Sequence, residues 1–188
     1  MKIHQVYDNA DKRRTYKEYC GKYRKAINEK FYFEAMMIAY SMIEDRLKSF
    51  LYHIGAFDRI TDTKICKKVH QYLKNIVIDY RKPKENEKLN ISTISGKIKI
   101  IRCTLNWAAT VNGGYDEDKY LIALKSQYEG AFDIDEFLDV LDEIDKWREY
   151  RNEVIHALLN KNIESLKEEL MIQTEYGMQL ARKLDSYR

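Results

Sequence analysis

Glycine and proline are scarce in this chain, and their scarcity constrains its fold more than any other feature of the sequence. The 188 residues include seven glycines and a single proline, Pro83. Glycine and proline are the residues that most often end or interrupt regular elements. The chain is therefore suited to long uninterrupted segments, which are typical of helices, and the sequence predicts an all-α fold.

Apolar residues recur at helical spacing through most of the chain. The pattern predicts helices at about residues 12–28, 30–54, 63–80, 92–109, 116–129, 133–159 and 162–187. In the fourth of these, the stretch KIKII also alternates like a strand. A helix capped by Ser92 or Thr93 is the better prediction, because nothing else in the sequence offers a strand to pair with it.

A solvated loop is predicted at about residues 81–91, which hold the only proline and a run of charges. Gly55 is well suited to stop the second helix. Too little chain surrounds the loop for two separate cores. We therefore expect one domain, residues 1–188, containing six to seven helices.

Charge and cysteine content exclude several classes of protein. The 33 basic and 30 acidic residues give a net charge of +3, which is too balanced for a chain that coats nucleic acid, so any RNA contact would be local. The cysteines, Cys20, Cys66 and Cys103, are odd in number and irregularly spaced, which predicts reduced and mostly buried thiols.

No apolar run approaches the roughly 20 residues of a membrane span, and the N-terminus has no secretory signal. We expect a cytoplasmic protein with no membrane contact.

The sequence contains no motif for other kinds of chemistry. There is no glycine-rich phosphate loop, no H-E-x-x-H and no cysteine pair at metal spacing, so no cofactor and no metal are expected. The acidic residues between 135 and 145 fall mostly on one outer face and are interpreted as solvated. Glu44 lies at the edge of an apolar stripe, where it is predicted to pair with a buried arginine or histidine. Asp45 and Arg46 are predicted to face the solvent.

The segment Trp147–Asn160 combines core-like side chains with polar residues that have functional chemistry. At roughly 100° per residue, the apolar stripe of its helix consists of Phe137, Leu138, Leu141, Ile144, Ile155 and Leu159. Arg148, Asn152 and His156 follow one another at i, i+4 and i+8 on that same stripe. Buried polar groups need a partner or a function, so this segment is the candidate site.

Arg151, Asn152 and His156 form the pattern R-N-x-x-x-H. Arg151 and His156 are about 140° apart around an ideal helix, so they do not share one face. A π-turn, the reach of the arginine stem or a second copy of the chain would bring them together. Without one of these, Arg148 is as well placed as Arg151.

The R-N-x-x-x-H stretch resembles the signature of the HEPN superfamily, all-α proteins defined by an arginine and a histidine a few residues apart late in the chain. The chain length, the helical pattern and the position of the motif on the penultimate helix agree with that family. The resemblance implies a HEPN-like helical bundle and a homodimer in which two motif helices form a composite cleft. In active members this cleft cleaves single-stranded RNA without a metal. The ribose 2′-hydroxyl attacks the adjacent phosphorus and leaves a 2′,3′-cyclic phosphate and a 5′-hydroxyl.

The residue types suit this chemistry. A histidine exchanges protons near neutral pH, and an arginine fork binds a negative phosphorane. Asn152 is expected to orient the imidazole of His156 or to hold the phosphate. The predicted catalytic residues are Arg151, Asn152 and His156, with Arg148 and Glu44 supporting them.

The resemblance also implies a biological setting and a second reading. Family members often act in prokaryotic defence, as toxins with an antitoxin partner or as abortive-infection proteins. The alternative is a non-catalytic HEPN module that binds a nucleotide or a partner protein such as a nucleotidyltransferase antitoxin. Toxins with such partners tend to have Tyr two residues after the histidine, where this chain has Leu158. A third reading is a helical scaffold in which His156 fills the core and Arg148, Arg151 and Glu44 form ion pairs.

Overall fold

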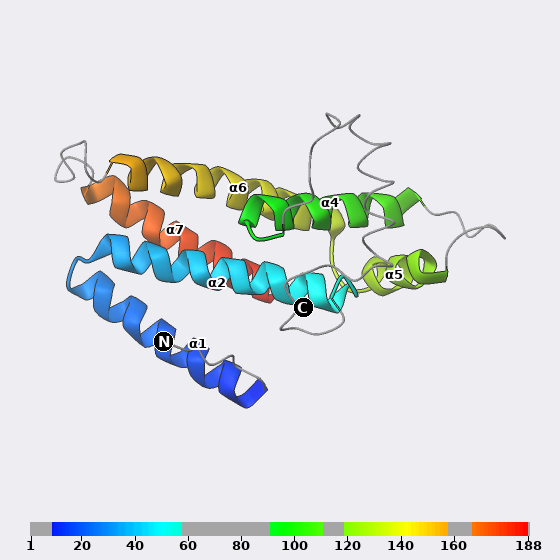
Figure 1. Cartoon of the computed structure of the whole chain (residues 1–188), viewed down its shortest axis with the longest axis horizontal. Coiled ribbons are helices and arrows are strands. Elements are labelled where there is room, and N and C mark those ends of the chain that lie inside the picture. Colours follow the sequence, from blue (N-terminus) through cyan, green and yellow to red (C-terminus); the bar gives the residue numbers. More distant parts are fainter. Residues whose placement is uncertain (1–8, 58–90, 111–118, 158–166, 188) are drawn as a thin grey trace.

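A computed structural model describes residues 9–57, 91–110, 119–157 and 167–187, and this part of the chain is helical with no strand (Figure 1). Its helices are α1 (Asn9–Asn28), α2 (Tyr32–His53), α4 (Ile94–Thr110), α5 (Lys119–Glu129), α6 (Ile134–Ala157) and α7 (Lys167–Asp185). The predicted all-α class is confirmed for these residues. The KIKII stretch lies inside α4, so the choice of helix over strand is also confirmed. The predicted helix at 63–80 and most of the loop at 81–91 lie outside the described residues.

The long helix α2 is the centre of the packing. It packs most extensively against α7, and α1 and α4 contact it as well. The motif helix α6 packs on α7 and α4, and α5 packs on α4. Figure 1 shows α1, α2, α7 and α6 side by side, with α4 beside one half of α6.

Short-range signals set several helix ends. The Thr93 Oγ1 accepts a hydrogen bond from the Gly96 backbone N–H at 3.0 Å, which confirms Thr93 as the cap of α4. Asp133 Oδ1 accepts hydrogen bonds from the backbone N–H groups of Asp135 and Glu136 at 2.9 and 3.1 Å and caps α6. Gly55 has a φ of 74°, the left-handed conformation expected of a residue that stops a helix.

An aromatic cluster joins the N-terminal half of α6 to α2. Phe50 of α2 packs against Phe137 of α6 with ring centroids 4.7 Å apart. Tyr128, Phe132 and Tyr187 pack around this pair. Edge-to-face and tilted pairs of this kind add to the stability that burial of the rings already provides, so this end of α6 is held firmly.

A tryptophan docks the other half of α6 onto α7. Trp147 is only 2% exposed, and its indole N–H donates to the Gln173 backbone carbonyl oxygen at 2.8 Å. The ring lies against Gly177, where an added Cβ would be 2.2 Å from the nearest ring atom. Gly177 therefore provides the space for the indole, and the pair fixes the position of α6 along α7.

Arg46 ties α1, α2 and α7 together, so the prediction that it faces solvent is wrong. It is 8% exposed, donates to the Ala181 backbone carbonyl and pairs with Asp185 at 3.3 Å. Its guanidinium also lies 5.2 Å from the centre of the Tyr16 ring. The long arginine stem allows the charge to reach carbonyl and carboxylate oxygens at the end of α7 while the chain is buried, which helical phase alone does not reveal.

Asp45 is half-buried and serves the same junction. It accepts a hydrogen bond from the Tyr16 hydroxyl at 2.6 Å and pairs with Lys12 at 2.9 Å. Burial and the neighbouring carboxylate of Asp45 raise the pKa of Tyr16 well above its ordinary value. The hydroxyl therefore stays protonated and continues to donate to Asp45.

The described residues bear on the predictions of reduced thiols and of no membrane-spanning helix. Cys20 is half-buried and Cys103 is buried, and they form no disulfide in this part of the chain; Cys66 lies outside it. No described helix combines the length and the apolar character needed to cross a membrane.

We predict that Gly177→Ala lowers the free energy of unfolding by about 3 kcal/mol, because the new methyl group overlaps the Trp147 ring. The matched control is Gly21→Ala in α1, where an added Cβ meets nothing within 4 Å. That change should be neutral or stabilising by up to about 1 kcal/mol, as expected for alanine in a helix. Urea unfolding of both variants measures the difference, and equal effects would contradict the packing described.

We also predict that Arg46→Ala lowers the free energy of unfolding by about 2–3 kcal/mol, since it removes a buried stem and a charge-assisted hydrogen bond. Arg14→Ala is the control. Arg14 pairs with Asp11 at 2.8 Å, but its side chain is 80% exposed, so its loss should change stability by less than about 0.5 kcal/mol. Thermal or urea unfolding separates the two, and a minor effect at Arg46 would refute its role at this junction.

Candidate functional site

The motif occupies the last turns of α6, which is a regular α-helix from Ile134 to Ala157. No π-turn interrupts it, so Arg151 and His156 keep a separation of about 140° around the helix axis. The π-turn considered from the sequence is therefore absent. The reach of the arginine side chain and a second copy of the chain are the remaining ways to unite the two residues.

The buried face of α6 differs from the predicted apolar stripe. It consists of Phe137, Val140, Leu141, Ile144, Trp147, Val154 and Ala157. Leu138 and Ile155 are only half-buried, and Leu159 lies outside the described residues. The shift follows from the docking of Trp147 against Gly177, which turns the face containing Trp147 and Val154 toward α7.

The polar residues of the motif therefore border the core. The prediction that they interrupt the buried stripe is wrong. Arg148, Arg151 and Asn152 are half-buried, and His156 is exposed. The reading in which His156 fills the core does not apply, because a core histidine would be shielded from solvent.

Arg151 reaches across to α2 and is held there by three contacts. Its guanidinium lies 4.2 Å from the centre of the Tyr40 ring, which is cation–π geometry. One terminal nitrogen donates to the Met37 sulfur at 3.1 Å, and the other donates to Asn152 Oδ1 at 3.1 Å. The Nε atom is buried and has no hydrogen-bond partner among the described residues. These contacts fix the orientation of the guanidinium, and no acidic side chain of the described residues pairs with it.

The side chain of Asn152 contacts the arginine of the motif. Its side-chain oxygen accepts a hydrogen bond from Arg151, so it orients the arginine. His156 lies in the last turn of α6, one turn beyond Asn152, with its side chain exposed. In the described residues, Arg151 and Asn152 contact each other, and the imidazole of His156 is exposed one turn farther along the helix.

The supporting residues are engaged in ion pairs. Arg148 pairs with Asp145 at 2.7 Å and with Glu149 at 3.3 Å. Glu44 pairs with Lys97 of α4 at 2.9 Å, and the Lys97 side chain is only 5% exposed. Glu44 therefore has a buried cationic partner, as the stripe-edge position suggested, but the partner is a lysine. Arg148 is neutralised locally, which favours Arg151 as the cation of the motif.

Sequence reasoning missed the platform under Arg151. Met37 and Tyr40 are three positions apart on α2, and Glu44 follows four positions later, so the three side chains lie along one edge of that helix. This spacing is a signal that the sequence carries. It does not say which arginine, from which distant helix, would lie on Tyr40.

The contacts of α4 lie away from the motif turns of α6. Lys97 anchors the first turn of α4 at Glu44, and Arg102 donates to the Leu138 carbonyl at 3.1 Å and pairs with Asp142. These contacts place α4 along the N-terminal part of α6, as Figure 1 shows. In the described residues, α4 does not extend to the turn that carries Asn152 and His156.

No group of three or more His, Cys, Asp or Glu side chains in the described part of the chain is arranged to hold a metal ion.

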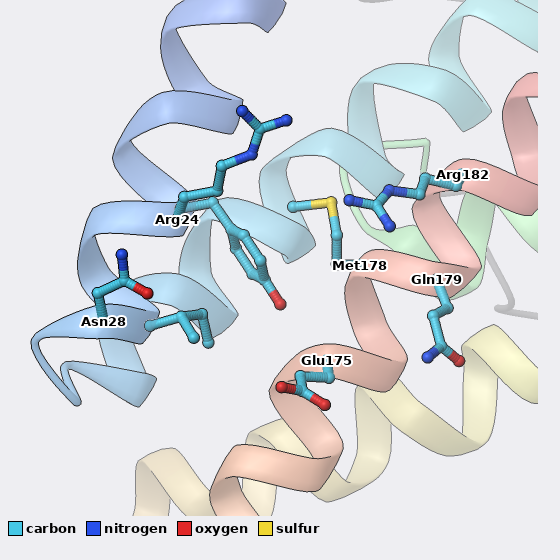
Figure 2. Close-up of a pocket in the computed structure, with 8 residues that line it drawn as sticks. Arg24, Asn28, Glu175, Met178, Gln179 and Arg182 are labelled. Carbon is cyan, nitrogen blue, oxygen red and sulfur yellow. The ribbon is translucent and has the colours of Figure 1, made fainter.

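A separate hollow of about 310 Å³ lies between α1 and α7 and contains no residue of the motif (Figure 2). The ring of Tyr23 lines it, and the Tyr23 hydroxyl donates to the Thr174 backbone carbonyl at 3.3 Å. Burial and then the charge of Glu175 raise the pKa of Tyr23 to about 12, while the charge of Arg182 opposes this rise. The two opposed charges thus act on the same hydroxyl, and both belong to α7.

Comparison with known proteins identifies no relative. No protein-family model matches the chain, and no curated protein or solved structure matches it. The HEPN resemblance therefore rests on the motif and its helical setting.

We predict that Tyr23 contributes a pH-dependent term to stability. Its pKa is about 12 in the folded chain against an ordinary value of 10.0. The unfolded chain releases this proton first, so the stability present below pH 10 is lost as pH rises from about 10 to 12, by roughly 2–3 kcal/mol in total.

Tyr23→Phe tests this sign. The variant should be about 1 kcal/mol less stable at pH 8, where the hydrogen bond is lost, and its stability should fall less steeply above pH 10. Urea unfolding of both proteins at pH 8, 10 and 11.5 makes the comparison. Other tyrosines contribute to both profiles equally, so parallel curves would contradict the prediction.

Proposed function

We propose that this chain is a metal-independent endoribonuclease of HEPN type that cleaves single-stranded RNA. The products would carry 2′,3′-cyclic phosphate and 5′-hydroxyl ends. The site residues are Arg151, Asn152 and His156, and two copies of the chain contribute them to one composite cleft. The setting that the resemblance suggests is prokaryotic defence, with the chain acting as a toxin or an abortive-infection protein.

The observation that carries the proposal is the way Arg151 is held. Tyr40 and Met37 support the guanidinium from α2, and Asn152 fixes it from its own helix. A cation oriented before the substrate arrives stabilises a developing negative charge without having to reorganise. The exposed imidazole of His156 lies on the next turn of the same helix.

The proposed reaction needs two proton transfers. The imidazole of one His156 takes the proton from the ribose 2′-hydroxyl, whose oxygen then attacks the adjacent phosphorus. Arg151 binds the phosphorane oxygens as negative charge develops. The bond from phosphorus to the 5′ oxygen breaks, and a second imidazole in its protonated form gives that oxygen a proton. A homodimer supplies the second imidazole.

The homodimer also addresses the five-residue offset. Within one regular α-helix, Arg151 and His156 project in directions about 140° apart. Two α6 helices facing each other would place the arginine of one copy near the histidine of the other. A strictly monomeric protein would therefore argue against this proposal.

The alternative is a non-catalytic HEPN module that binds a nucleotide or a partner protein such as an antitoxin. One observation favours it. Both terminal nitrogens of Arg151 already have partners within the chain, an arrangement that would also suit a purely structural arginine. Cleavage assays separate the two functions.

The expected result is cleavage of 5′-labelled single-stranded RNA by the wild type in excess chelator, with cyclic-phosphate ends. His156→Ala should lower the rate by about 10²–10⁴-fold, the usual contribution of a general acid or base. Arg151→Ala should lower it by about 10²–10³-fold, as for the loss of a group that stabilises the transition state. Tyr40→Leu should cause a smaller loss, because it removes only the platform of Arg151.

His53→Ala and Arg148→Ala are the matched controls. His53 is an exposed histidine at the end of α2, and Arg148 is bound in local ion pairs. Both variants should keep wild-type cleavage. Equal activity in every variant would mean a contaminating nuclease, and binding of a nucleotide with no cleavage in the wild type would favour the alternative.

A further inference from the structure

The first helix is strongly basic in a chain whose charges otherwise nearly balance. Helix α1 contains seven Lys or Arg side chains against two Asp or Glu, while the whole chain has a net charge of only +3. Local concentration of one sign of charge on a helix is the electrostatic signature of a polyanion-binding surface. The distribution of ion pairs on α1 shows which part of that surface is available.

Four basic residues of α1 have acidic partners, and the other three have none among the described residues. The pairs are Lys12 with Asp45, Arg14 with Asp11, Lys22 with Glu18 and Lys25 with Glu29. The side chains with no acidic partner among the described residues are exposed: Arg13, Lys17 and Arg24. They occupy positions i, i+4 and i+11, so they lie within about 40° of one another and form one stripe along roughly 16 Å of helix.

The stripe leads into the hollow between α1 and α7. Figure 2 shows the guanidinium of Arg24 extending from α1 and that of Arg182 extending toward it from α7, with Met178 between them. Arg182 is exposed and also has no acidic partner in the described part of the chain. The side chains of Asn28 and Gln179 add hydrogen-bonding groups to the hollow.

One end of the hollow carries a negative charge. Glu175 lies one turn before Gln179 on α7 and points away from the two arginines in Figure 2. Its negative charge disfavours an anion at that end. An anion is therefore expected between Arg24 and Arg182, continuous with Lys17 and Arg13.

We propose that the stripe Arg13–Lys17–Arg24, together with Arg182, binds the phosphodiester backbone of a single-stranded RNA. The inference deepens the proposed function, on which it rests in taking RNA as the ligand. The length of the stripe suits a linear polyanion better than a single phosphate. An open groove of positive charge that follows the backbone is how proteins bind single strands without reading their sequence.

The test measures binding, so cleavage does not enter it. A fluorescent 2′-O-methyl oligoribonucleotide of 12 residues lacks the hydroxyl that attacks phosphorus and stays intact. Fluorescence anisotropy with the full chain gives its affinity at several salt concentrations. Failure of this test and failure of the nuclease proposal are thus separate results.

Charge-reversal variants at neighbouring positions provide matched controls. Arg24→Glu and Arg182→Glu should each weaken binding at least tenfold. Lys25→Glu and Lys183→Glu change the net charge equally, but those lysines pair with Glu29 and Glu143 outside the hollow. These two should weaken binding less than threefold. Glu175→Gln should strengthen binding, and Arg24→Ala should lower the salt slope by about 0.7, the value for one phosphate contact on a single strand.

Three results would overturn the proposal. Equal weakening by all four reversals would mean that only the overall charge matters. No weakening by Arg24→Glu and Arg182→Glu would remove the groove from the RNA surface. Tighter binding of a poly-glutamate peptide than of the oligonucleotide, with the same dependence on Arg24 and Arg182, would assign the groove to an acidic protein segment. Circular dichroism checks that each variant keeps its helix content.

Discussion

The contact between Trp147 and Gly177 determines where the motif can lie. The indole needs the space that only a glycine leaves on α7, and its N–H reaches the Gln173 carbonyl when the two helices are in this register. Trp147 precedes Arg151 by one turn of α6. Four residues are about 40° around an α-helix, so the position of the guanidinium relative to α2 is set by packing one turn earlier on nearly the same side of its own helix.

The contacts of Arg151 differ from those of an ordinary surface arginine. Surface arginines gain little from ion pairs with exposed carboxylates, as the 80% exposed side chain of Arg14 illustrates. Arg151 instead has an aromatic face, a thioether sulfur and an amide oxygen as its partners. None of these neutralises the charge, so the cation keeps its attraction for a phosphate. That property is common to the catalytic and the binding readings of the motif.

Much of the fold follows from local sequence signals, whereas the site depends on tertiary contacts. Apolar periodicity located the described helices, and Thr93 and Gly55 behave as their types and positions predict. The engagement of Glu44 in an ion pair was also visible at the edge of its stripe, although its partner is Lys97 and not the predicted arginine or histidine. The burial of Arg46 was not, because it depends on carbonyl and carboxylate oxygens of a helix far along the chain. The rotation of α6 that buries Trp147 was not visible in the sequence either, because it depends on the tertiary contact with Gly177 of α7.

One edge of α2 carries two contacts that belong to different parts of the protein. Tyr40 supports Arg151 of α6, and Glu44, one turn later, pairs with Lys97 of α4. Motion of a single side chain disturbs only one of these contacts, but sliding of α2 along its axis disturbs both together. A displacement of α4 that shifts α2 would therefore reach the guanidinium through α2, in addition to the direct contact of α4 with the motif helix α6.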